Sequence, residues 1–166
     1  MKINLKLKQK LINVRLVLTD VDGVLTDGGM YYSEKGESLK KFNTRDGMGF
    51  ELLLKNNIKT VMITRENSKI ALVRGKKIKS ALTIINCRQK ELELPKICRR
   101  FNLKPEQIAY LGDDVNDAAI MKKVLVSFSP SDGHYTIKQL ADFVCETKGG
   151  DGVFREVADM IIQSKQ

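Results

Sequence analysis

The stretch that most constrains the fold of this chain is L-V-L-T-D-V-D-G-V-L-T-D, at residues 16–27. Its apolar, β-branched start is typical of a buried strand. Asp20 and Asp22 follow at the carboxyl end of that strand, and Gly23 lets the backbone turn. Because residues i and i+2 of a strand point the same way, both carboxylates face the sheet edge where open α/β folds bind ligands. Two such charges ~4 Å apart repel by ~4 kcal/mol. The pair therefore needs a cation, a shared proton or separate roles, unless it is a solvated surface turn.

Composition narrows the class of protein. The chain has 166 residues, 42% of them hydrophobic, which suits a single globular domain over residues 1–166. Its net charge is +9, but no basic cluster is interleaved with aromatic residues, so we expect an anionic small-molecule substrate and no nucleic acid. No apolar run approaches the ~18 residues of a membrane span, so we expect no membrane partner. Three scattered cysteines and the lack of a secretory signal predict a cytoplasmic protein with reduced thiols.

Strands that alternate with helices along the chain predict an α/β fold with a doubly wound, mostly parallel sheet. The expected strands are residues 14–18, 59–63, 81–85, 108–111, 124–128 and 142–145. The expected helices are residues 1–13, 48–56, 69–78, 89–101, 118–123, 131–140 and 153–162. Ser68 can cap the third helix, and Pro95 suggests that the regular part of the fourth starts near it.

Residues 28–43 predict a β-hairpin, because two short strand-like segments flank a polar turn that contains Gly36. The hairpin directly follows the acidic pair, so it can project over the site as a flap. No other insertion is evident, and we expect no cap domain.

Polar side chains stand at the carboxyl ends of successive expected strands. They are Asp20, Asp22, Thr64, Lys90, Asp113, Asp114 and Asp117. Acidic oxygens from two strand ends suit Mg²⁺, which keeps several waters and accepts substrate phosphate. A hydroxyl and an ammonium group supply donors for phosphoryl oxygens, and a carboxylate that attacks phosphorus gives an aspartyl-phosphate.

Four motifs resemble those of the haloacid dehalogenase superfamily of phosphohydrolases, namely D-V-D-G-V-L-T-D-G, V-M-I-T, Lys90 and L-G-D-D-V-N-D. Three further stretches extend the resemblance over about residues 14–162: F-N-T-R-D-G-M-G-F, residues 105–117 and G-G-D-G-V-F-R-E-V. Together they resemble the capless branch that dephosphorylates 2-keto-3-deoxy sugar acid phosphates. That branch holds the 3-deoxy-manno-octulosonate 8-phosphate phosphatases, their nine-carbon relatives and the C-terminal domain of some acylneuraminate cytidylyltransferases.

The resemblance implies a role for each matching residue. Asp20 matches the nucleophile and Asp22 the general acid/base. Asp20, the carbonyl of Asp22, and Asp113 match the Mg²⁺ ligands, whereas Thr64 and Lys90 match the residues that hold the phosphate.

Other matches are looser. Asp114 and Asp117 match acids that orient metal waters and the phosphate-binding lysine, with helix capping as the plain alternative. Arg45 and Asp46 match a region near the sugar. Arg155 matches an arginine near the site of a neighbouring subunit, although a surface arginine of a helix would look the same.

One departure bears on the substrate. The family commonly has T-G-R where this chain has Thr64-Arg65-Glu66. In the resembling branch, eight-carbon enzymes favour arginine at the position of Glu66, and nine-carbon, sialic-type enzymes favour glutamate there with lysine at the position of Lys77. The resemblance therefore slightly favours a nine-carbon ulosonate 9-phosphate. Arg65 is unusual in either group, and a helix-start glutamate with a surface lysine is the plain alternative.

The resemblance also implies a homotetramer in which the hairpin packs against other subunits. A competing hypothesis is an inactive domain that serves only oligomer assembly in sialic-type sugar biosynthesis, but the complete set of polar residues speaks against it. A phospho-accepting receiver domain would carry its acceptor on a middle strand, whereas here the paired acids follow the first. His134, the one histidine, stands at a helix start and is assigned no catalytic role.

Overall fold

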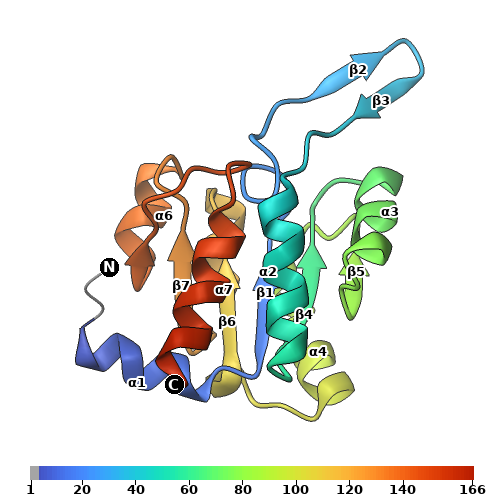
Figure 1. Ribbon diagram of the computed structural model, residues 1–166. Coiled ribbons are helices and arrows are strands. Elements are labelled where there is room, and N and C mark those ends of the chain that lie inside the picture. The colour runs from blue at the N-terminus through green and yellow to red at the C-terminus, as the bar shows by residue number, and fades with distance from the viewer. Residues whose placement is uncertain (1–3) are drawn as a thin grey trace.

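Strand β1 (Leu16–Thr19) lies inside a six-stranded, entirely parallel sheet, as the computed structural model of residues 4–166 shows (Figure 1). All four of its residues are buried, as expected for a strand covered on both faces. In spatial order the strands are β5 (Leu82–Ile84), β4 (Lys59–Ile63), β1, β6 (Ile108–Leu111), β7 (Val126–Ser129) and β8 (Phe143–Val144). The predicted α/β class with a parallel sheet is confirmed.

Two layers of helices cover the sheet, because the side chains of each strand alternate between its faces. Val17 of β1 belongs to one apolar cluster, and Leu16 and Leu18 belong to the other. The first cluster includes residues of α1 (Leu5–Asn13), α2 (Thr44–Lys55), α3 (Lys69–Lys77) and α7 (Val153–Ser164). The second includes residues of α4 (Leu94–Phe101), α5 (Ala118–Met121) and α6 (Tyr135–Leu140). The rings of Phe50 and Phe154 stack with their centroids 4.1 Å apart and join α2 to α7.

Some elements are shorter than their patterns predict. The expected helix 89–101 is divided into a 3-10 turn (Lys90–Leu92) and α4, where Pro95 lies in the first turn, the position that tolerates its missing N–H. Helix α6 begins at Tyr135 and not at residue 131, because His134 caps it and donates its own N–H to the carbonyl of Asp113 at 2.7 Å. Residues 1–3 of the expected first helix lie outside the described part of the chain.

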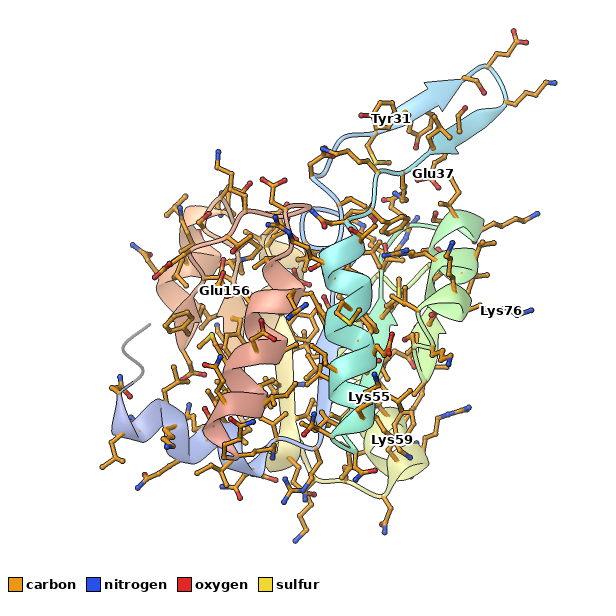
Figure 2. All side chains as sticks on the ribbon, in the orientation of Figure 1. Tyr31, Glu37, Lys55, Lys59, Lys76 and Glu156 are labelled. Carbon is orange, nitrogen blue, oxygen red and sulfur yellow. The ribbon has the colours of Figure 1, made fainter. Side chains whose placement is uncertain are left out.

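The predicted hairpin consists of β2 (Tyr31–Ser33) and β3 (Gly36–Leu39), paired antiparallel. It projects away from the two helical layers at the carboxyl edge of the sheet (Figure 1), and Tyr31 lies on this projecting part (Figure 2). Tyr31, Tyr32 and Leu39 are exposed there. No helix within residues 4–166 is long and apolar enough to cross a membrane.

Candidate active site

The register of the sheet brings the ends of three strands to one edge. Thr19 of β1 is paired with Met62 of β4 and with Leu111 of β6. The next residue of β1, Asp20, donates its N–H to the carbonyl of Leu111 at 2.9 Å. A depression of about 230 Å³ opens at this edge. Its lining is Asp20, Asp22, Thr64, Arg65, Glu66, Asp113, Asp114, Val115 and Asn116.

Lys90 is buried and joins two of the strand-end acids. Its Nζ is 2.9 Å from Oδ1 of Asp20 and 2.6 Å from Oδ1 of Asp117, and its side chain is 1% exposed. The Tyr110 hydroxyl also donates to Oδ1 of Asp117, at 2.6 Å. Oδ2 of Asp117 accepts the backbone N–H of Asp113 at 3.0 Å. Both oxygens of Asp117 are thus committed to donors of the protein, and this carboxylate fixes Lys90 and the loop after β6.

The carboxylates of Asp20, Asp113 and Asp117 form a cluster whose ligand atoms lie within 4.8 Å of one another. Burial, reinforced by the negative charge of Asp117, raises the pKa of Asp20 to about 7. Burial, reinforced by Asp20 and Asp117, raises the pKa of Asp113 to about 9. When ionised, these three carboxylates and Lys90 leave two negative charges unbalanced, which is the charge of one divalent cation.

Two further observations fit a cation at this cluster. Oδ1 of Asp113 is buried and has no hydrogen-bond partner among residues 4–166. Gly23 has a positive φ of 84°, and a Cβ there would lie 2.0 Å from Oδ2 of Asp113, so glycine leaves the room that this carboxylate occupies. Clustered carboxylate oxygens are the donors that Mg²⁺ prefers, and the residues present fit this ion.

Asp22 has partners different from those of Asp20. Its Oδ2 accepts the hydroxyl of Thr64 at 3.0 Å, and its Oδ1 pairs with Lys40. Asp20 instead accepts the N–H of Val21 at 2.7 Å and contacts Lys90. The two acids of the pair therefore stand in separate environments, which permits two different chemical roles.

Sequence reasoning did not single out Lys40. It follows β3, and its side chain is 1% exposed because it lies between Asp22 and Glu37, whose Oε1 is 2.6 Å from Nζ. Burial alone would lower the pKa of Lys40, but the hydrogen bonds from its ammonium group to the two carboxylates outweigh burial and raise it. The sequence does place a lysine where the hairpin returns to the site. Nothing in the sequence distinguishes Lys40 from the nearby Lys35 and Lys41, however.

The expected substrate-end residues divide into two groups. Glu66 and Arg65 line the depression, and the N–H of Glu66 donates to the Thr64 hydroxyl at 3.0 Å. Arg45 and Arg155 line a separate cavity of about 400 Å³. Lys77 lines another of about 550 Å³.

Asp46 lies away from the depression as well. It is 2% exposed, and its Oδ1 accepts the backbone N–H of Arg155 at 3.1 Å, at the start of α7. The Arg155 side chain is held by Asp159, whose oxygens are 2.8 and 2.9 Å from Nε. Within this chain, the structure does not bring Arg45, Asp46, Lys77 or Arg155 to the strand-end acids.

Comparisons with known proteins agree with this geometry. Residues 55–157 match the family of haloacid dehalogenase-like hydrolases. The 3-deoxy-D-manno-octulosonate 8-phosphate phosphatase of Haemophilus influenzae is 36% identical over 159 residues, which cover 96% of this chain and 88% of that protein. Its cobalt-bound structure superposes with a TM-score of 0.92 over 95% of this chain and 92% of that one. The corresponding Moraxella catarrhalis enzyme, in complex with magnesium, phosphate and KDO, is 27% identical and has a TM-score of 0.92, covering 95% and 91% of the two chains.

Proposed function

The chain belongs to the haloacid dehalogenase-like hydrolases and is a phosphoric monoester hydrolase. We propose that its substrate is a 2-keto-3-deoxy sugar acid phosphate and that Mg²⁺ is its cofactor. The observation that carries the proposal is the meeting of Asp20, Asp22 and Lys90 at one sheet edge, with separate partners for the two aspartates. Our first candidate substrate is 3-deoxy-D-manno-octulosonate 8-phosphate, because the relative that matches 96% of this chain is named for it.

In the proposed first step, the Asp20 carboxylate attacks phosphorus. A bond forms between its oxygen and phosphorus, and the bond from phosphorus to the sugar oxygen breaks. Asp22 donates a proton to that leaving oxygen. The Lys90 ammonium group, and the Thr64 hydroxyl that now bonds Asp22, would donate to the phosphoryl oxygens.

In the second step, water attacks the aspartyl-phosphate. Asp22, now ionised, takes a proton from this water. The bond between the Asp20 oxygen and phosphorus breaks, which releases phosphate and leaves Asp20 as a free carboxylate. Asp22 thus serves as acid and then as base, and its partners, Thr64 and Lys40, are separate from those of Asp20.

We assign the cofactor to Asp20, the carbonyl oxygen of Asp22, and Asp113, whose Oδ1 lacks a partner among residues 4–166. Bound there, Mg²⁺ would offset the negative charge that the phosphoryl group and the carboxylates bring together. We assign Asp117 to positioning and not to ligation, because both of its oxygens already accept protein donors. Asp114 lies exposed beside it, where it can orient waters.

A nine-carbon ulosonate 9-phosphate is the second candidate substrate, and Glu66 is the observation that favours it. This carboxylate lines the depression beside Thr64, where it can accept hydrogen bonds from substrate hydroxyls. The eight-carbon candidate rests on the names of relatives, and the nine-carbon candidate rests on this one side chain.

The test is phosphate release from eight- and nine-carbon ulosonate phosphates, with Mg²⁺ and with a chelator. We expect turnover with Mg²⁺ and its loss on chelation. No release from any member of the panel by folded, Mg²⁺-supplied protein would contradict the proposal and favour the assembly-only alternative.

We further propose that residues 1–166 act as one domain and assemble as a homotetramer. The depression is open to solvent, and no inserted cap domain covers it within residues 4–166. The exposed apolar side chains Tyr31, Tyr32 and Leu39 of the hairpin are suited to contact other copies. In such an assembly, Lys77 or Arg155 can reach the site of a neighbouring subunit.

A further inference from the structure

The carboxylate of Asp22 is held by a donor on each oxygen. Thr64 donates its hydroxyl to Oδ2 at 3.0 Å, and the Lys40 ammonium group pairs with Oδ1. The terminal torsion of an aspartate side chain is intrinsically broad, so the torsion itself does not fix the plane of the carboxylate. Two donors on opposite oxygens do fix it.

The two donors are not equivalent during the reaction. Thr64 stands at the end of β4 beside the proposed phosphate position, so its hydroxyl can turn to a phosphoryl oxygen when substrate binds. Lys40 comes from the hairpin and has no such second task. If Thr64 turns to the substrate, Lys40 is the donor left on Asp22.

Lys40 is itself fixed by a second carboxylate. Its Nζ lies 2.6 Å from Oε1 of Glu37, and Oε2 of Glu37 accepts the hydroxyl of Ser68 at 2.5 Å. Ser68 is buried and caps α3, where its Oγ accepts the N–H of Ala71. Figure 2 shows Glu37 where the hairpin descends toward α3. A continuous chain of hydrogen bonds thus links the start of α3, through the hairpin, to Asp22.

The burial of the Lys40 side chain distinguishes its contact with Asp22 from an ordinary surface ion pair. Exposed pairs contribute little because solvent screens them, but the Lys40 side chain is 1% exposed. Two of its three donor hydrogens are directed to Asp22 and Glu37, and its Nζ also lies 3.9 Å from the sulfur of Met30.

We propose that Lys40 is a positioning residue, which holds the Asp22 carboxylate in the orientation needed to protonate the leaving sugar oxygen. The inference rests on the proposed function, since it assigns Asp22 the proton transfer. It also gives the hairpin a part in the chemistry, in addition to its proposed part in assembly.

The test compares Lys40→Met with the wild type on two substrates. A sugar acid phosphate needs a proton on its leaving oxygen, whereas p-nitrophenyl phosphate releases a stable phenolate without one. A misplaced catalytic group costs up to ~10²-fold. We therefore expect kcat on the sugar acid phosphate to fall by ~10- to 100-fold, with KM within about twofold and a smaller fall on p-nitrophenyl phosphate.

A double-mutant cycle supplies the decisive reading. If Lys40 acts through Asp22, Lys40→Met should cause no further loss in an Asp22→Asn background. Additive losses in the double mutant would overturn the inference. Lys41→Met is the matched control, because Lys41 is the next residue, is 63% exposed and pairs with Asp27 outside the depression. It should behave as the wild type.

Two further measurements distinguish failure of this inference from misfolding of the variant and from failure of the proposed function. Glu37→Gln leaves Lys40 in place but weakens its anchor, and it should show the same substrate dependence to a smaller degree even if Lys40→Met does not fold. Full activity of a folded Lys40→Met protein would overturn the inference alone. Absence of phosphate release by the wild type would overturn the proposed function and the inference with it.

Discussion

Lys90 and Asp117 form an ion pair whose Nζ and Oδ1 atoms are 2.6 Å apart and whose side chains are at most 1% exposed. Breaking a buried pair by removing one partner is costly because the other charge stays buried. Removing Lys90 would cost more than breaking this one pair, because Lys90 also pairs with Asp20. The three clustered acids would then lose the cation that two of them contact. The pair therefore links stability to the proposed phosphate binding.

Lys90→Met should abolish turnover and, without Mg²⁺, lower the free energy of unfolding by about 3–5 kcal/mol. Denaturant unfolding followed by circular dichroism measures the second effect. Asp117→Asn in the same chain should recover part of the loss, because it removes one of the uncompensated charges. Lys96→Met is the control. Lys96 makes an exposed pair with Glu93, worth about 0–1 kcal/mol.

Asp20→Asn should abolish phosphate release and leave the fold intact, because an amide is a poor nucleophile and a weaker ligand for Mg²⁺. Without the ion, the variant should be at least as stable as the wild type, since it removes one of the clustered carboxylates. Asp22→Asn should slow turnover by ~10²–10⁴-fold, as for loss of a general acid–base. Asp27→Asn, with an exposed carboxylate, is the control. Near-normal release by a pure, folded Asp20→Asn protein would refute the assignment.

Asp46 should make stability depend on pH. Burial raises its pKa from an ordinary 3.8 to about 6, even though the N–H groups of Arg155 and Phe154 and the charge of Arg74 oppose the shift, and Asp151 adds to it. The folded state thus holds this proton more tightly than the unfolded chain. The resulting stabilisation is complete below about pH 4 and is lost as the pH rises through 6.

Asp46→Asn does not titrate, so its free energy of unfolding should improve relative to the wild type between pH 4 and pH 7, by up to about 3 kcal/mol. Urea unfolding of both proteins across this range measures the difference. A difference that does not change with pH would refute the prediction. If Asp46 only holds α7, phosphate release should persist in the variant, whereas a role near the sugar predicts its loss.

The sequence predicts the position of a site residue where that position follows from the strand pattern, and fails where it depends on contacts between distant segments. Asp20, Thr64 and Asp113 were predictable as neighbours, because parallel strands bring their carboxyl ends together whatever the details of packing. Lys40 was not, because its burial depends on how the hairpin returns over Asp22. Such a contact has no local pattern.

The surroundings of Asp46 escaped prediction for a related reason. The resemblance placed Asp46 near the sugar, but α7, from the far end of the chain, packs over it and donates the N–H of Arg155. The limits of α6 were missed because the cap at His134 depends on a bond to the carbonyl of Asp113. Strand ends follow from local periodicity, whereas these contacts join segments that are distant in sequence.

The hairpin should hold the proposed tetramer together. Tyr32 and Leu39 are 63% and 64% exposed, so replacing both by serine should not disturb the subunit fold. Sedimentation velocity at micromolar concentration should show a tetramer for the wild type and smaller species for the variant, with reduced activity. Leu5→Ser is the control, because Leu5 is equally apolar, is 73% exposed and lies on α1. A fully active wild-type monomer would contradict the proposal.

Glu66 should decide between the two candidate substrates. Its backbone N–H is bonded to the hydroxyl of Thr64, so the backbone of Glu66 is held beside the residue that we propose binds phosphate. An additional carbon lengthens the substrate between that phosphate and its carboxylate. A glutamate at this position can accept hydrogen bonds from the substrate's hydroxyls. An arginine would instead donate hydrogen bonds to the substrate's carboxylate, which lies at a different distance from the phosphate in the shorter sugar acid.

Glu66→Arg should therefore lower kcat/KM for the nine-carbon 9-phosphate and spare or improve that for the eight-carbon 8-phosphate. A buried polar partner left unpaired costs ~1–3 kcal/mol, so the ratio of the two values should change by roughly five- to 150-fold. Glu106→Arg makes the same change of charge in the turn before β6, at the opposite edge of the sheet, and should leave the ratio unchanged. Equal loss on both substrates would mean that Glu66 only supports its loop. The nine-carbon candidate would then lose the side chain on which it rests, and the eight-carbon substrate of the named relatives would stand alone.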